Sequence, residues 1–193
     1  MVSRFEGLRK IPSGPAARML AAANARLVER TGLPASADVA QTLSVLDQKA
    51  ADMDILRLLS VALPPRERVW WACLAARDTL APDAGAPPTL TTAEAWVRKP
   101  GDETKAAARQ ALEAADPDDD LTLCATAAVF ADGTLGAGDL ARLPSPPGAS
   151  EAASFGMNVL CIARRAGDFR TETARLIDRG LDIARGGNGR GQP

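Results

Sequence analysis

Apolar residues recur at every third or fourth position along most of this sequence, and proline or glycine interrupts the pattern at short intervals. This spacing places the apolar side chains on one face of an α-helix. Ala-rich segments with few β-branched and aromatic residues also favour helix over strand. No strand-like alternation and no internal repeat stands out. The sequence therefore predicts an all-α fold, a single orthogonal bundle of about seven or eight helices stacked as αα-hairpins.

Three segments carry sharper expectations about where helices begin and end. A first helix is expected from a cap at Ser13, continuing through Val28 and closing at Gly32. Residues 54–63 are apolar on most sides, which is typical of a central helix. Thr91-x-x-Glu94 reads as a capping box for a short helix that contains Trp96.

The length of 193 residues suits one domain with a sizeable core. We expect a single helical domain over residues 1–185 and a disordered Gly-rich tail over residues 186–193. Residues 133–149 carry several prolines. They are expected to form an ordered or semi-extended strap, since neither flanking part looks like a complete domain.

The composition excludes several classes of function. The chain has no His and therefore lacks the commonest general base and metal ligand. Catalysis by Ser-His-Asp or Cys-His is excluded within this chain. A net charge of -1 gives no basic excess for nucleic acid. We expect no enzyme activity, no cofactor and no nucleic-acid partner.

Neither the cysteines nor the acidic run predicts a metal site. Cys73, Cys124 and Cys161 lie far apart in apolar stretches, so we expect buried free thiols in a reducing cytoplasm. The run Asp116–Asp120 resembles a calcium loop, but Leu121 replaces the required glycine at the sixth position. It is interpreted as an acidic helix start.

The N-terminal region partly resembles an export signal. Ala16–Ala25 follows basic residues and ends in an A-x-A pattern, but Arg18 breaks the apolar stretch. No segment approaches the roughly 18 apolar residues of a membrane span. We therefore expect a cytoplasmic protein without a membrane span.

The tryptophans suggest where a partner binds. Trp70 and Trp71 are adjacent, so on a helix they point about 100° apart. One of the pair is then expected at the edge of the core. Trp96 is followed by Arg98 and Lys99, and exposed Trp and Arg dominate binding hot spots. The predicted partner-binding residues are Trp71, Trp96, Arg98 and Lys99, with core filling by the tryptophans as the alternative.

The segments Arg68–Arg77 and Ala95–Glu103 resemble a family of uncharacterised helical proteins of proteobacteria. These proteins are of about this chain's length, and their genes can lie near type VI secretion loci. The resemblance covers residues 68–105 and extends to Leu121–Phe130. It implies a helical accessory protein and carries over no catalytic residues.

The sequence thus favours a non-enzymatic helical module that binds another protein, as a bacterial adaptor, chaperone or secretion-system accessory protein. The alternative is an immunity or inhibitor protein that binds and blocks a toxin. An enzyme without His chemistry is the third hypothesis. An exposed apolar patch would favour the adaptor. A concentrated acidic face would favour an inhibitor of a basic toxin.

Overall fold

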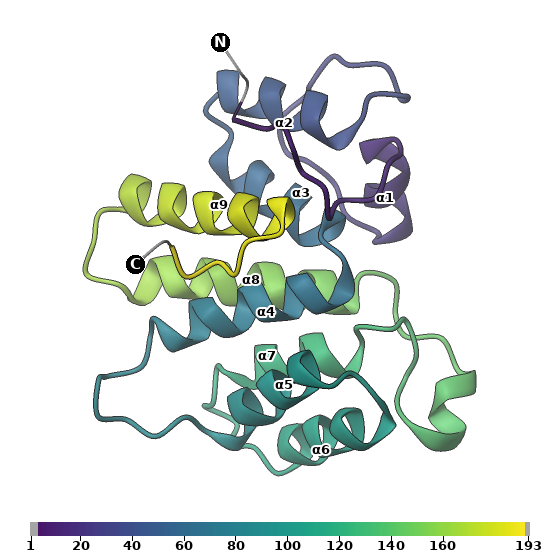
Figure 1. Cartoon of the computed structure of the whole chain (residues 1–193), viewed down its shortest axis with the longest axis vertical. Helices are drawn as coiled ribbons and strands as arrows, with labels where there is room; N and C mark the ends of the chain where they lie inside the picture. The colour runs from purple at the N-terminus through teal and green to yellow at the C-terminus, as the bar shows by residue number, and fades with distance from the viewer. Residues whose placement is uncertain (1–3, 192–193) are drawn as a thin grey trace. The chain divides into compact units, whose positions relative to one another are not determined.

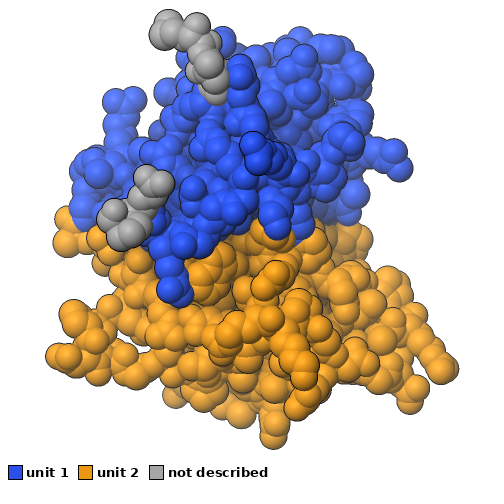
Figure 2. All heavy atoms as spheres, viewed as in Figure 1, with its two compact units in different colours: residues 1–64, 167–193 blue, residues 65–166 orange. Residues whose placement is uncertain are grey.

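The computed structural model of the chain describes residues 4–191. Within them lie nine α-helices, one 3-10 helix and two isolated β-bridges, but no strand, which confirms the all-α fold class. None of these helices combines the length and the apolarity that crossing a membrane requires. The chain divides into two compact units, coloured separately in Figure 2. The single domain over residues 1–185 stays a prediction, because two compact units can belong to one domain or to two.

Unit 1 consists of residues 1–64 and 167–193, of which 4–64 and 167–191 are described. Its four helices are listed here in chain order: α1 (Ala16–Ala22), α2 (Val39–Gln48), α3 (Asp52–Ala62) and α9 (Phe169–Arg185). Helix α3 contacts each of the other three, so it is the centre of this unit (Figure 1). Its residues Ile55, Leu56, Leu58 and Leu59 are fully buried. Residues 54–63 are predicted to form a central helix because they are apolar on most sides, and this burial confirms the prediction.

The first helix of unit 1 is shorter than predicted. It starts after Pro15, not Ser13, and ends at Ala22, and Asn24 then adopts a left-handed backbone with φ of 49°. The buried carboxylate of Asp54 accepts hydrogen bonds from the Val28 and Glu29 amides, at 2.8 Å and 2.7 Å. These amides would otherwise bond within a helix. A tertiary contact therefore holds this segment as a loop and leaves Val28 exposed.

Unit 2 consists of residues 65–166. Its α-helices are α4 (Pro65–Arg77), α5 (Pro88–Arg98), α6 (Asp102–Glu113), α7 (Thr122–Val129) and α8 (Ala149–Arg164). The short helix α7 contacts all four others (Figure 1). Cys124, Ala125, Ala127 and Ala128 are fully buried on it. Their small side chains let four helices approach one axis closely.

The start of α5 differs from the predicted capping box. The helix begins at Pro88, where a missing N–H costs nothing, three residues before Thr91. Glu94 does not reach back to the helix start. Its carboxylate instead accepts two hydrogen bonds from Arg77 of α4, each of 2.8 Å. This bidentate ion pair, a strong type of contact, fixes α5 against α4.

All three cysteines are buried free thiols, as predicted. Cys73 on α4 and Cys124 on α7 lie close enough to hydrogen-bond. This hydrogen bond, and burial after it, raises the pKa of the Cys73 thiol well above its ordinary value. A thiol that stays protonated and inaccessible is chemically inert.

The chain after α9 turns back on the end of that helix. The Gly187 amide donates to the Asp182 carbonyl at 2.9 Å, and the Gly189 amide donates to the Asp182 carboxylate at 2.8 Å. Residues 192–193, the end of the tail predicted to be disordered, lie outside the described residues.

The packing around α7 predicts the effect of a larger side chain there. Ala128→Leu should lower the free energy of unfolding by about 1–3 kcal/mol, because a fully buried position between helices has no room for added methyl groups. Ala107→Leu on the exposed face of α6 is the matched control and should change it by less than about 0.5 kcal/mol. Urea unfolding measures both. Equal effects would contradict the packing of α7.

The buried cysteines predict resistance to alkylation. At neutral pH the native chain should take up no iodoacetamide at Cys73, Cys124 or Cys161 on the timescale that modifies all three in urea. Intact-mass spectrometry counts the adducts. Rapid modification of any one thiol in the native protein would show that its helix opens readily.

Candidate functional site

Two of the four residues predicted to bind a partner lie in the core. Trp71 on α4 is fully buried, and Trp96 on α5 exposes only 6% of its surface. Trp70, adjacent to Trp71, is the half-buried ring at the edge of the core. The expectation that adjacent rings diverge therefore describes this helix, but the outer ring is Trp70. Neither Trp71 nor Trp96 offers its ring to a partner.

The other two, Arg98 and Lys99, are exposed at the end of α5. The last carbonyls of this helix are occupied, since Val97 accepts from Arg66 Nε at 2.7 Å and Lys99 accepts from the Thr104 hydroxyl at 2.8 Å. Cations at a helix C-terminus also complement its dipole. Arg98 and Lys99 are therefore accessible to a partner, whereas the Trp71 and Trp96 rings are not.

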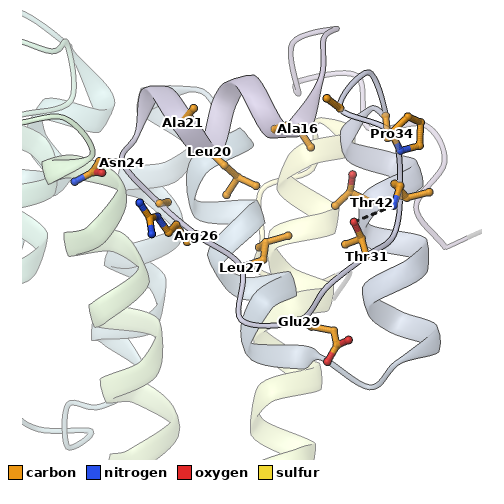
Figure 3. A pocket seen from close by; sticks show the side chains of 15 residues that line it. Ala16, Leu20, Ala21, Asn24, Arg26, Leu27, Glu29, Thr31, Pro34 and Thr42 are labelled. Atoms are coloured by element: carbon orange, nitrogen blue, oxygen red, sulfur yellow. Dashed lines mark hydrogen bonds between the residues drawn. The ribbon is translucent and has the colours of Figure 1, made fainter.

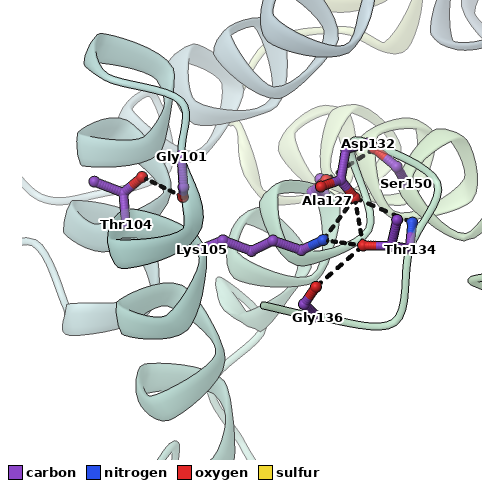
Figure 4. Close-up of polar contacts among 8 residues, drawn as sticks. All are labelled: Gly101, Thr104, Lys105, Ala127, Asp132, Thr134, Gly136 and Ser150. Carbon is purple, nitrogen blue, oxygen red and sulfur yellow. Dashed lines mark hydrogen bonds and ion pairs between the residues drawn. The ribbon is translucent and has the colours of Figure 1, made fainter. Parts of the chain in front are cut away.

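A buried lysine near this end of unit 2 holds a loop in place (Figure 4). Lys105, in the first turns of α6, exposes 2% of its surface. Its Nζ donates to Asp132 Oδ1 at 2.6 Å and to the Thr134 hydroxyl. The Thr134 amide donates to the same carboxylate at 3.0 Å. The ammonium is therefore surrounded by acceptors from one turn, which compensates for its burial.

The electrostatics of Asp132 reflect this contact. Partial burial favours the neutral acid, but the hydrogen bonds from Lys105 and Thr134 outweigh it and lower the pKa of Asp132 below its ordinary value. The Asp132 carboxylate is therefore charged at neutral pH, and it forms an ion pair with Lys105.

The segment that Lys105 holds, residues 133–145, is named here the leucine loop. Its ends are joined by two backbone hydrogen bonds, Leu135 N to Leu143 O at 2.8 Å and Ser145 N to Gly133 O at 2.9 Å. The 3-10 helix η1 (Gly138–Arg142) forms its far side. A compact surface loop whose ends lie close together is frequently functional.

The leucine loop packs closely against α6. A Cβ atom at Gly136 would lie 3.0 Å from Leu140 Cδ1 and 3.1 Å from Arg109 Nε, so a side chain at this position would have to displace Leu140 or Arg109. Just beyond the loop, the Ser150 hydroxyl donates to the Ala127 carbonyl of α7 at 2.8 Å (Figure 4). The loop is therefore held on both sides of its base, while Leu140 and Leu143 stay 38% and 49% exposed.

The sequence interpretation missed this role of Lys105. Lysine is almost never fully buried unless paired, and no local pattern links Lys105 to a turn that follows almost thirty residues later. One signal was present. Lys105 and Ala108 share the buried face of α6, so the lysine stands on the apolar side of its helix.

Unit 1 carries two grooves. One, of about 580 Å³, lies between α1 and the loop that follows it, with Leu20 and Leu27 among its lining side chains (Figure 3). The other, of about 500 Å³, is flanked by Val28 and Phe169, which are 85% and 56% exposed. Small or aliphatic side chains form most of the first groove, whereas six of the eleven residues that line the second are charged.

Comparison with known proteins identifies one family. The model of a family of unknown function, DUF6931, matches residues 42–184. This range includes all of unit 2, with Lys105 and the leucine loop, and most of the helices of unit 1. No curated protein and no solved structure matches the chain.

The burial of Lys105 predicts unequal costs for removing the two partners of the ion pair. Asp132→Ala should lower the free energy of unfolding by about 3 kcal/mol, because the ammonium it leaves behind is buried. Lys105→Met should cost only about 1 kcal/mol, because the Asp132 side chain is 48% exposed and water can solvate it. Urea unfolding of both variants measures the difference. Equal costs, or the reverse order, would contradict this account of the anchor.

The lowered pKa of Asp132 sets the pH range of this effect. A carboxyl whose folded-state pKa lies below its unfolded value of about 3.9 contributes its full stability above that value. The contribution is lost as the pH falls through the folded-state pKa. The stability difference between wild type and Asp132→Asn should therefore be constant near neutral pH and shrink below about pH 4.

Proposed function

Since the chain belongs to the DUF6931 family, whose function is unknown, we propose its role from its own geometry: it is a non-enzymatic helical module that binds another protein. The observation that carries the proposal is the leucine loop. It exposes two large apolar side chains, Leu140 and Leu143, on a segment whose base is fixed by the ion pair between the buried Lys105 and Asp132.

The energetics of binding favour such a surface. Single exposed apolar residues are normal on any protein. Two of them on one anchored loop differ, because their position is set before a partner arrives. Association then spends little free energy on ordering the loop, and a preorganised surface binds more tightly for the same contact area. The leucines supply apolar area and the anchor supplies preorganisation.

Charged residues at the same end of unit 2 suit the rim of an interface. Arg98 and Lys99 end α5, and α6 begins shortly after them with the turns that hold Lys105. Arg142 on η1 is exposed as well. A polar rim around an apolar centre is the usual anatomy of a protein interface. In this proposal Arg98 and Lys99 keep their predicted role, whereas Trp71 and Trp96 are core residues.

The biological role that follows is that of an adaptor, chaperone or accessory protein. The resemblance to proteobacterial proteins encoded near type VI secretion loci supports a secretion accessory role. The three buried free thiols support a reducing compartment, and a cytoplasmic location is part of this proposal.

An immunity or inhibitor function is the second candidate. It is favoured by the acidic residues at the end of α6 and in the turn that follows, where Glu113, Asp116 and Asp118 are exposed. Acidic surfaces of this kind attract basic partners and speed their association.

The proposal predicts that the leucine loop is needed for partner capture. The full chain with Leu140→Ser and Leu143→Ser should lose a specific partner that the wild type retains from lysate of the native cell. Its thermal midpoint should change little, because both side chains are substantially exposed. Quantitative mass spectrometry of the captured proteins measures the loss.

The matched control is Val28→Ser with Phe169→Ser, which removes two exposed apolar side chains from unit 1. This control should retain the partner. Equal retention by the wild type, the loop variant and the control would reject the leucine loop as the binding surface. A wild type that enriches no protein specifically would reject the proposed function itself.

A further inference from the structure

A pocket of about 290 Å³ lies at the other end of unit 2 from the leucine loop, between the start of α5 and the end of α6. In Figure 1 the chain enters α5 on the left, and the green segment between α7 and α8, which contains the leucine loop, lies on the right. Most of the wall is apolar, from Pro87 and Pro88 at the start of α5 and from Ala111 and Ala114 of α6. Proline carries no N–H, so this part of the wall offers no backbone donor to an anion.

Two carboxylates complete the wall, and both are oriented by hydrogen bonds. Asp119 accepts from the Thr89 hydroxyl at 2.7 Å and from the Leu121 amide at 2.9 Å. Asp116 Oδ1 accepts from the Asp118 amide at 2.9 Å. Each carboxylate oxygen has two acceptor positions, so both groups retain capacity for further donors.

No cationic side chain lines this pocket. On the neighbouring helices, Arg164 of α8 pairs with Asp120, and Arg109 of α6 lies 3.8 Å from Glu113 and beside Gly136 of the leucine loop. The negative charge of Asp116 and Asp119 is therefore not balanced from within the pocket. The end of α6 adds the negative pole of its dipole and the start of α5 adds the positive pole of its own, so the two helix dipoles oppose each other here and the charge of the pocket comes from its two carboxylates.

We propose that this pocket binds an arginine side chain of a basic partner protein. The aliphatic stem of arginine suits the proline and alanine walls. Its planar guanidinium presents donors in a fork that matches carboxylates such as Asp116 and Asp119. A metal ion suits the pocket poorly, because the apolar walls supply no oxygen ligands for a cation such as Ca²⁺.

This inference rests on the proposed function, since it names the chemistry of a protein partner, and it adds a second contact point. The two ends of unit 2 then differ in what they recognise. The leucine loop binds an apolar surface of the partner, and the pocket binds a cationic side chain. A partner that contacts only the pocket would be a basic protein, which is the class of partner that the immunity or inhibitor function requires.

The test uses the full chain and a fluorescein-labelled peptide of alternating arginine and glycine, followed by fluorescence anisotropy at low ionic strength. Asp116→Asn should weaken binding about tenfold, since it removes a charged acceptor but retains an oxygen for the Asp118 amide. Ala114→Leu should weaken binding by filling the pocket without any change in charge. Thermal midpoints verify that both variants fold.

Asp118→Asn is the matched control, because it removes the same charge two positions away from a residue outside the pocket lining. It should weaken binding less than about twofold. Equal weakening by Asp116→Asn and Asp118→Asn would mean that a diffuse acidic surface binds the peptide, and it would overturn the proposal. A peptide with lysine in place of arginine that binds equally well would overturn the choice of arginine.

Two further outcomes separate this inference from the proposed function. The leucine-loop variant should bind the arginine peptide as tightly as the wild type does. If it does, while no protein is captured from lysate, the proposed function fails and the pocket chemistry stands. Self-association detected by light scattering and abolished by Asp116→Asn would identify a second copy as the occupant and overturn the proposal.

Discussion

The architecture of unit 2 depends on the small side chains of α7. Four helices pack around this one short helix, and its buried face consists of alanine and cysteine together with Val129. Small side chains permit close approach, and the larger residues that fill the remaining space come from the surrounding helices, as Trp71 and Trp96 show. The two large tryptophan rings and the small alanines of α7 therefore fill the same core together.

Both candidate surfaces follow from where α7 begins and ends. The turn that enters α7 carries Asp116 and Asp119 to the start of α5, and the turn that leaves it carries Asp132 and Thr134 to α6. A rigid central helix thus fixes two turns at opposite ends of unit 2 (Figure 1). One turn closes an anionic pocket and the other fixes the leucine loop. The helix that forms the centre of the core, α7, therefore also positions both proposed contact points.

The helical fold followed from the sequence because periodic apolar spacing is a local signal, and residues 54–63 illustrate how far it reaches. The errors arose where a distant side chain decides the local conformation. The carboxylate of Asp54 accepts hydrogen bonds from the Val28 and Glu29 amides and holds as a loop a segment that was predicted to be helical. Glu94 pairs with Arg77 and leaves α5 without its predicted cap. Lys105 was missed for the same reason, since its partners lie far away in the sequence.

The exposure of Arg98 and Lys99 was foreseen, but the burial of Trp71 and Trp96 depends on which helices surround them.

The central claim is that the ion pair of Lys105 holds the leucine loop as a fixed surface. Amide hydrogen exchange followed by NMR on the full chain tests it most directly, at the Leu135 and Ser145 amides that close the loop. The account predicts slow exchange at both amides in the wild type and fast exchange in Asp132→Ala, with the α7 amides protected in both proteins. Exchange of Leu135 and Ser145 at the rate of an unstructured peptide in the wild type would contradict it.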